Sequence, residues 1–275
     1  MTKKHPHENK PLDVENPLRK RYSEAIKEVM PAMNDNERRL QALENVLEAA
    51  KSGDESKVRL LISHAADSPQ AETKFQGYTA LHLAARDGLE MLARVFLETG
   101  GDVHRRSNSG ETAIFMAVKA GHAAVVRLLL ENGASAHDKK HDKWYGVSQL
   151  STAVQYGHAE VVKILIKYGS ISEQIDKSSH ALVSAILRNY VEMVAFLLEN
   201  GADIDQIVSW CDDTPLHAAT RAGPELTKLL LKTKPNLEIG DRYGMSPLHG
   251  YLMSASINTE VVSLLIEAGA NISPE

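Results

Sequence analysis

Residues 77–103 read GYTALHLAARDGLEMLARVFLETGGDV, and variants of this stretch recur along the chain. Residues 110–136 read GETAIFMAVKAGHAAVVRLLLENGASA, and residues 213–237 read DTPLHAATRAGPELTKLLLKTKPNL. The residue that opens each unit, usually a hydroxyl residue, falls at six positions: Thr79, Thr112, Ser148, His180, Thr214 and Ser246. The intervals between them are 33, 36, 32, 34 and 32 residues, which indicates an internal repeat with a period near 33.

Each unit carries the pattern of two helices. The first helix is short, has small residues such as Ala84 and Ala85 on its inner face, and ends at Gly88, because glycine adopts the left-handed conformation without a Cβ penalty. The second helix is apolar at helical spacing, as in residues 125–130, and this stripe is too wide for an isolated helix in water. Each unit must therefore pack on its neighbours.

A period near 33 that contains T-P-L-H-x-A resembles the ankyrin repeat. The resemblance covers about residues 36–272 in roughly seven units, the first of them marked by Ala49, Ala50 and Gly53. It implies an all-α ankyrin-repeat solenoid of stacked helix-turn-helix units with projecting turns. It also implies that His82, His217 and His249 tie down the start of the first helix instead of performing chemistry.

The chain is predicted to divide into three segments: a disordered N-terminal tail at 1–15, an N-terminal capping helix at 16–35 and the repeat array at 36–275. Asn16 can cap the helix, Pro17 suits its first position and Pro31 ends it. Its apolar stripe is expected to dock over the first unit: Leu18, Tyr22, Ile26 and Val29.

The C-terminal end is predicted to be thinly covered, because only a few residues follow the last apolar stripe at 261–266. Three explanations remain open at this stage: a frayed final helix, a partner that covers it, or a chain that continues in a longer protein.

Composition favours a folded protein that is not secreted. The 275 residues are 43% hydrophobic and 24% charged, and the formal net charge of -5 argues against a general binder of nucleic acid or acidic membranes. Cys211 is the single cysteine, so no internal disulfide is possible. The sequence shows no signal-peptide core and no apolar run long enough to span a bilayer. We predict a cytoplasmic location, with a nuclear one left open.

No sequence motif indicates catalysis. The nucleophile elbow, the zinc-protease motif, the dinucleotide fingerprint and the phosphate loop are absent from the sequence. His137 and His141 are four residues apart, which would suit a metal on a helix, but no cysteine pair or third ligand is near. We therefore predict no catalytic residue, no cofactor and no metal. The alternative is an enzyme or small-molecule binder that uses groove residues.

The residues that differ between units indicate a binding surface. In ankyrin-repeat proteins the partner usually meets a groove lined by the turn tips and the first helices, and the resemblance carries this role to matching positions here. Trp, Tyr and Arg dominate measured interface hot spots. The alternative for a tip aromatic is packing on the adjacent turn. The predicted partner-binding residues are Phe75, Arg86, Arg105, Arg106, Lys119, Trp144, Tyr145, Tyr156, Arg188, Trp210, Arg221, Arg242 and Tyr243.

Charge along this edge is uneven. The early turns are basic through Arg105, Arg106, Lys139, Lys140 and Lys143, and the later turns are acidic through Asp203, Asp205, Asp212 and Asp213. The predicted partner is another protein with an acidic segment that is steered toward the early repeats. The chain alone is expected to be monomeric. A solvated polar edge without partner preference is the alternative.

Overall fold

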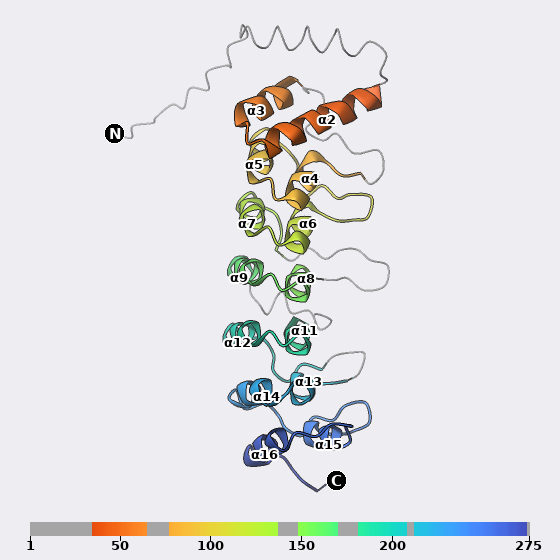
Figure 1. The fold of residues 1–275 in the computed structure, drawn as a ribbon, viewed down its shortest axis with the longest axis vertical. Coiled ribbons are helices and arrows are strands. Elements are labelled where there is room, and N and C mark those ends of the chain that lie inside the picture. The colour runs from red at the N-terminus through yellow and green to blue at the C-terminus, as the bar shows by residue number, and fades with distance from the viewer. Residues whose placement is uncertain (1–34, 65–76, 137–147, 170–180, 208–211, 274–275) are drawn as a thin grey trace, which may run out of the picture.

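The computed structural model describes residues 35–64, 77–136, 148–169, 181–207 and 212–273. These residues form seven helix pairs stacked in one row, which confirms the predicted all-α solenoid (Figure 1). The first helices of the pairs are α2 (Asp35–Lys51), α4 (Ala80–Asp87), α6 (Ala113–Ala120), α8 (Gln149–Gln155), α11 (Ala181–Leu187), α13 (Pro215–Ala222) and α15 (Pro247–Leu252). The second helices are α3 (Glu55–His64), α5 (Glu90–Glu98), α7 (Ala123–Glu131), α9 (Ala159–Tyr168), α12 (Val191–Glu199), α14 (Pro224–Leu231) and α16 (Thr259–Glu267).

The helix that opens the stack is longer than the other first helices. Helix α2 has 17 residues, whereas α4 has 8. It crosses the N-terminal end of the stack in Figure 1. The predicted tail at 1–15 and the predicted capping helix at 16–35 lie outside the described residues, except for Asp35, where α2 begins. Both stay predictions.

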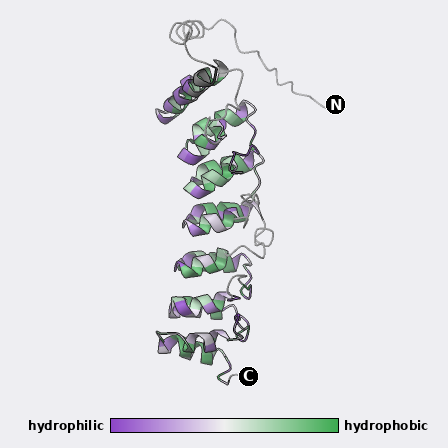
Figure 2. Cartoon of the chain, turned by 90° about the vertical axis from the view of Figure 1, so that its right-hand side faces the viewer, coloured by the Kyte–Doolittle hydropathy of each residue, from purple (hydrophilic) through white to green (hydrophobic). Residues whose placement is uncertain are grey.

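Small residues let the first helices approach one another closely. Ala84, Ala117 and Ala153 are completely buried on α4, α6 and α8, where consecutive first helices meet. The second helices form a parallel column beside them, and the turns between pairs gather along one edge (Figure 2). The buried residues of both columns form one continuous hydrophobic core. Each unit therefore completes its core only with the units above and below it.

The glycine that ends a first helix serves both the turn and the packing of the next unit. Gly88 has φ +72, and a Cβ built there would lie 2.6 Å from Nδ1 of His122. Gly121 repeats this arrangement with the ring of His158. Asn189 replaces the glycine in the fifth helix pair and takes the same left-handed conformation, with φ 57. Asparagine tolerates this region better than most residues, so the turn survives the replacement.

The last repeat exposes apolar side chains, as its short C-terminal sequence predicts. Ile266 of α16 is 42% exposed, whereas Leu130, its equivalent in α7, is 7% exposed. The difference arises because the next unit covers Leu130 within the stack. Among the described helices, none is both long and apolar enough to cross a bilayer.

We expect Leu129→Ala to lower the free energy of unfolding by about 2–5 kcal/mol, because it leaves a cavity between stacked second helices. Leu129 is 0% exposed. The matched control is Leu187→Ala, because Leu187 is 57% exposed and its truncation should change stability by less than about 0.5 kcal/mol. Chemical denaturation of the three proteins measures both values. Equal midpoints for the two variants would contradict the assigned core.

Candidate functional site

The motif histidine closes the start of its own helix and also reaches the next unit. Nδ1 of His82 accepts a hydrogen bond from the backbone N–H of Thr79 at 3.1 Å. Nδ1 is therefore unprotonated, so Nε2 carries the proton and donates it to the carbonyl of Glu111, 3.1 Å away in the next turn. One neutral imidazole thus joins two consecutive repeats.

The same two bonds recur at His217, and related contacts occur at His249. His217 accepts from the N–H of Thr214 at 3.1 Å and donates to the carbonyl of Met245 at 2.9 Å. His249 lies 2.9 Å from the hydroxyl of Ser246 and 3.3 Å from the carbonyl of Ile272. These contacts agree with the structural role predicted for the motif histidines.

A second row of histidines fixes the other end of the first helices. Nε2 of His122 lies 3.0 Å from the carbonyl of Arg86, and Nε2 of His158 lies 3.2 Å from the carbonyl of Lys119. Each ring belongs to the unit that follows the carbonyl it contacts. The backbone that carries these basic side chains is therefore held by the adjacent repeat.

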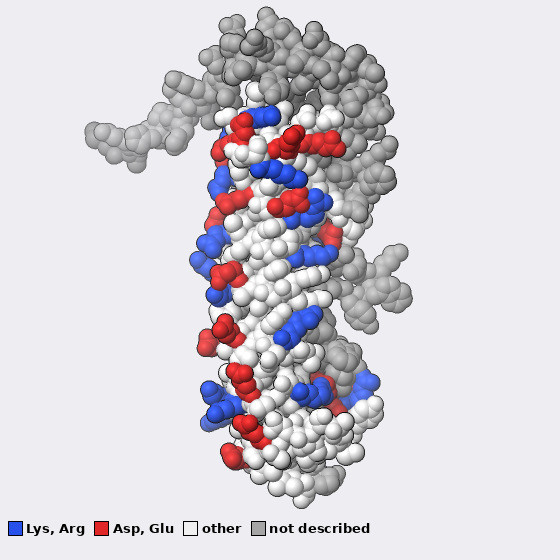
Figure 3. Space-filling view, viewed as in Figure 1, with Lys and Arg blue, Asp and Glu red and all other residues white. Residues whose placement is uncertain are grey.

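Five of the predicted site residues fall in one row at the C-terminal ends of the first helices. Because α4, α6, α8, α11 and α13 contact one another in that order, their ends form a continuous line. Figure 3 shows a column of basic residues along this face, beside acidic residues at the starts of the second helices. The row consists of Arg86, Lys119, Tyr156, Arg188 and Arg221, all of them exposed.

Two of these cations are paired and two are not. Arg86 lies 2.6 Å from Oδ1 of Asp87, and Arg221 forms an ion pair with Asp213. The hydrogen bond from Arg86 lowers the pKa of Asp87 below its usual range. Lys119 and Arg188 pair with no carboxylate among the described residues. The available positive charge of this row is therefore concentrated on Lys119 and Arg188.

The predicted turn residues that the structure describes lie in a second row of positions, at the opposite ends of the first helices. Arg105 and Arg106 precede α6, and the Arg106 guanidinium donates to the carbonyl of Gly110 at 2.9 Å, within its own turn. Arg242 and Tyr243 precede α15, several repeats away, and Tyr243 is 78% exposed. The two rows are separated by the length of a first helix, about 12 Å for the 8 residues of α4.

Several predictions fall outside the described residues. They are Phe75, Trp144, Tyr145, Trp210, the two histidines His137 and His141, and the basic residues Lys139, Lys140 and Lys143. The structure also exposes a large apolar side chain that is not among the predicted partner-binding residues. Leu187 ends α11 beside Arg188 and is 57% exposed. Its position before the helix break was the available signal in the sequence.

The comparison with protein-family models agrees with this geometry. A model described as ankyrin repeats (3 copies) matches residues 46–140, 135–208 and 205–275, which together cover most of the chain. The chain belongs to the ankyrin-repeat family.

Curated relatives match a part of these ankyrin repeats. Ankyrin repeat and SOCS box protein 6 of Pongo abelii is 34% identical over 98 residues, and that of Homo sapiens is 33% identical over 98 residues. Each match covers 34% of this chain and 23% of the relative. The similarity therefore concerns a minor part of those proteins.

Solved ankyrin-repeat structures match most of the array. The ankyrin repeat domain of human ASB11 is 29% identical, with a TM-score of 0.64, and the alignment covers 83% of this chain and 99% of that domain. An ankyrin repeat domain from Acinetobacter baumannii is 25% identical, with a TM-score of 0.61 and coverages of 70% and 98%. The Bcl-3 ankyrin repeat domain, at 21% identity, a TM-score of 0.67 and coverages of 81% and 97%, shows the shared fold alone.

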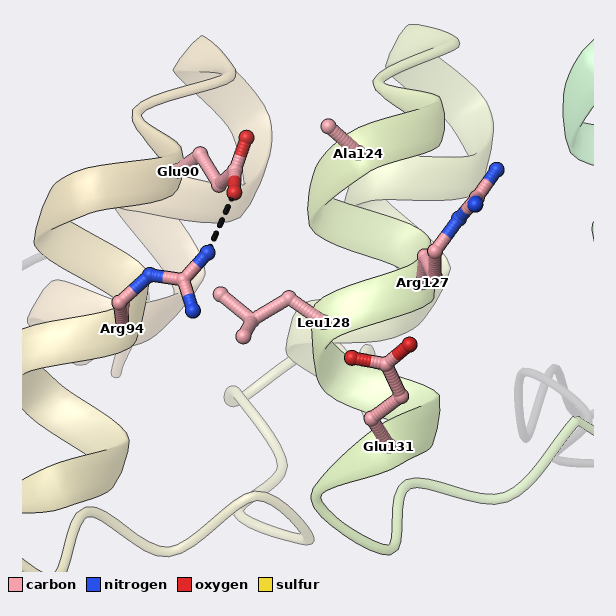
Figure 4. Close-up of a pocket in the computed structure, with 6 residues that line it drawn as sticks. All are labelled: Glu90, Arg94, Ala124, Arg127, Leu128 and Glu131. Carbon is pink, nitrogen blue, oxygen red and sulfur yellow. Dashed lines mark hydrogen bonds and ion pairs between the residues drawn. The ribbon is translucent and has the colours of Figure 1, made fainter.

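The ankyrin stack also has a pocket of about 350 Å³ between the second helices α5 and α7, away from both predicted rows. Arg94 lies 2.6 Å from Glu90 across its floor, and Figure 4 shows the guanidinium of Arg127 pointing away from that pair. Its lining is largely charged, which is unlike the mostly apolar lining of small-molecule sites. In the part of the chain that the structure describes, no cluster of three metal-ligating side chains occurs.

We expect His217→Ala to lower the free energy of unfolding by about 1–3 kcal/mol, because it leaves the buried backbone N–H of Thr214 without its partner and removes the bond to the next turn. Partner binding measured well below the melting temperature should persist. A folded His217→Ala protein that has lost all binding would instead place this histidine in the site. Thermal unfolding and a binding assay on the same sample separate these results.

Acidification should destabilise the stack through His82. Burial lowers the pKa of His82 below its ordinary value of 6.5, so the unfolded chain binds a proton more readily than the folded one. The stabilising effect of neutral His82 is complete above that value and is lost as the pH falls through the lower folded pKa.

The test is the free energy of unfolding of wild type and His82→Gln at pH 7.5 and pH 5.5. We expect wild type to lose more stability than His82→Gln over this interval, since the variant lacks the titrating ring. An equal loss in both proteins would show that His82 does not contribute to the pH dependence.

Proposed function

We propose that this ankyrin-repeat chain is a non-catalytic interaction scaffold that binds another protein in the groove between the two rows. The observation that carries the proposal is the pair Lys119 and Arg188, whose charges are unpaired among the described residues although acidic side chains are plentiful nearby. The neighbouring His158 holds the backbone of Lys119 in place. A partner that supplies carboxylates would complete this row.

The proposed partner carries an acidic segment. The formal net charge of the chain is -5, so the basic row is a local exception to the overall charge. Of the acidic residues in the later turns, Asp213 pairs with Arg221, and Asp205 accepts a hydrogen bond from the N–H of Asn236 at 2.9 Å. These carboxylates are engaged by groups of the chain itself. They therefore compete little with a partner for Lys119 and Arg188.

The turn tips complete the proposed surface. Tyr243 is exposed at a turn whose backbone is closed by bonds from Asp241, including the N–H of Tyr243 to Oδ1 at 2.8 Å. A rigid turn that presents an aromatic ring suits an interface because little conformational entropy is lost on binding. By the same repeat positions, we assign Phe75, Trp144, Tyr145 and Trp210 to this surface. We also propose a cytoplasmic location, with a nuclear one left open.

We expect the double variant Lys119→Glu, Arg188→Glu to bind the partner at least about tenfold more weakly at low salt, mainly through slower association. The partner is first recovered by affinity capture with the wild-type protein and then produced separately. Association and dissociation rates are measured at several salt concentrations, because screening weakens exposed charge interactions.

The matched control is Lys163→Glu, Lys228→Glu. Both lysines are exposed on second helices, so this variant has the same net charge change on the other column. We expect its binding to resemble that of wild type. If the control loses binding and the groove variant does not, the partner binds the second helices and the proposed groove is wrong.

A further inference from the structure

The basic row is interrupted at its centre by two exposed apolar side chains. Tyr156 caps the C-terminal end of α8 and is 49% exposed, and Leu187 ends α11 and is 57% exposed. Helices α8 and α11 pack directly against each other, so these two side chains belong to adjacent layers. Large apolar side chains exposed together at the middle of a row are unlike singly scattered surface residues.

Among the first helices α4 to α13, the interruption is confined to these two repeats. The second residue before the helix break is Arg86 in α4, Lys119 in α6 and Arg221 in α13. The same position holds Gln155 in α8 and Leu187 in α11. A cation therefore lies in the layer on each side of this uncharged centre, with Arg188 beside it.

Tyr156 is held by the scaffold. Its ring stacks on the ring of His158, with centroids 6.0 Å apart and an angle of 12° between planes. His158 in turn contacts the carbonyl of Lys119. The aromatic surface is thus presented in a fixed position next to a cation, which lowers the entropic cost of binding there.

We infer that Tyr156 and Leu187 form an apolar anchor site for one hydrophobic side chain of an extended acidic segment, with carboxylates on both sides of that side chain. This inference deepens the proposed function and rests on it. The Lys119 ammonium binds a carboxylate on one side of the anchor. Arg188 binds a carboxylate on the other side, and the anchor excludes water between them.

Layer spacing fixes the spacing of the recognised residues. Packed helices lie about 8–10 Å apart, and an extended chain advances about 3.3 Å per residue. One layer of the stack therefore corresponds to about three residues of an extended partner. The expected pattern is an acidic residue, two to four residues of any kind, a large apolar residue, two to four residues of any kind and a second acidic residue.

The experiment is a selection of random dodecapeptides displayed on phage against the wild-type protein. The same selection is run on Tyr156→Ala, Leu187→Ser and on the control Tyr168→Ala, Leu252→Ser. Tyr168 and Leu252 are also exposed, and Leu252 is likewise the last residue of a first helix. Wild type and control should enrich acidic peptides with the central apolar residue, whereas the anchor variant should enrich acidic peptides without it.

A peptide from the wild-type selection then gives the affinity. We expect the anchor variant to bind it at least about tenfold more weakly than the control does, as for loss of a buried anchor. Acidic peptides without a preferred apolar position would overturn the anchor and leave the proposed function intact. Peptides without acidic residues would overturn the proposed acidic partner itself. Retained affinity in the anchor variant would place the apolar contact elsewhere.

Discussion

The hydrogen bond from a motif histidine to the following turn is the contact on which the stack depends. In His82 and His217 one ring nitrogen accepts from the start of its own helix, and the other donates to a carbonyl of the next unit. A helix pair of this size cannot bury its apolar face alone. The histidine therefore links the start of its own helix to the stacking of the next unit, because the same ring bonds to both.

The period near 33 residues was sufficient to predict the helix pairs, their order and the buried residues, because stacking imposes the same small residues on every unit. The electrostatics of the site could not be predicted in this way. Asp213 and Arg221 pair across eight residues from opposite ends of α13, and no periodic signal marks that contact. The exposure of Leu187 could not be predicted from the sequence, because an apolar residue in a helix is normally buried.

Basic residues at the C-terminal ends of the first helices have two physical roles. A cation in the last turn interacts favourably with the helix dipole, which alone accounts for Arg86, Lys119 and Arg221 as helix-stabilising residues. This effect does not account for the absence of pairing at Lys119 and Arg188, nor for the exposed Leu187 between cations. Under the proposed function, these groups are available to a bound partner.

Buried and exposed residues occupy different positions along each first helix. The stability of the stack and the proposed partner binding therefore depend on different residues of the same helix. Ala153 is fully buried between layers, whereas Tyr156 one turn later is half exposed at the groove. The proposed partner spans α6 to α11, which are three consecutive layers, so it would bind only when those layers are stacked. Its binding energy consequently adds to the stacking energy of the central repeats, where each layer already relies on its neighbours. The exposed residues of the row differ between repeats, whereas the buried core residues recur. One repeated core can therefore support the proposed partner site, which no single repeat contains.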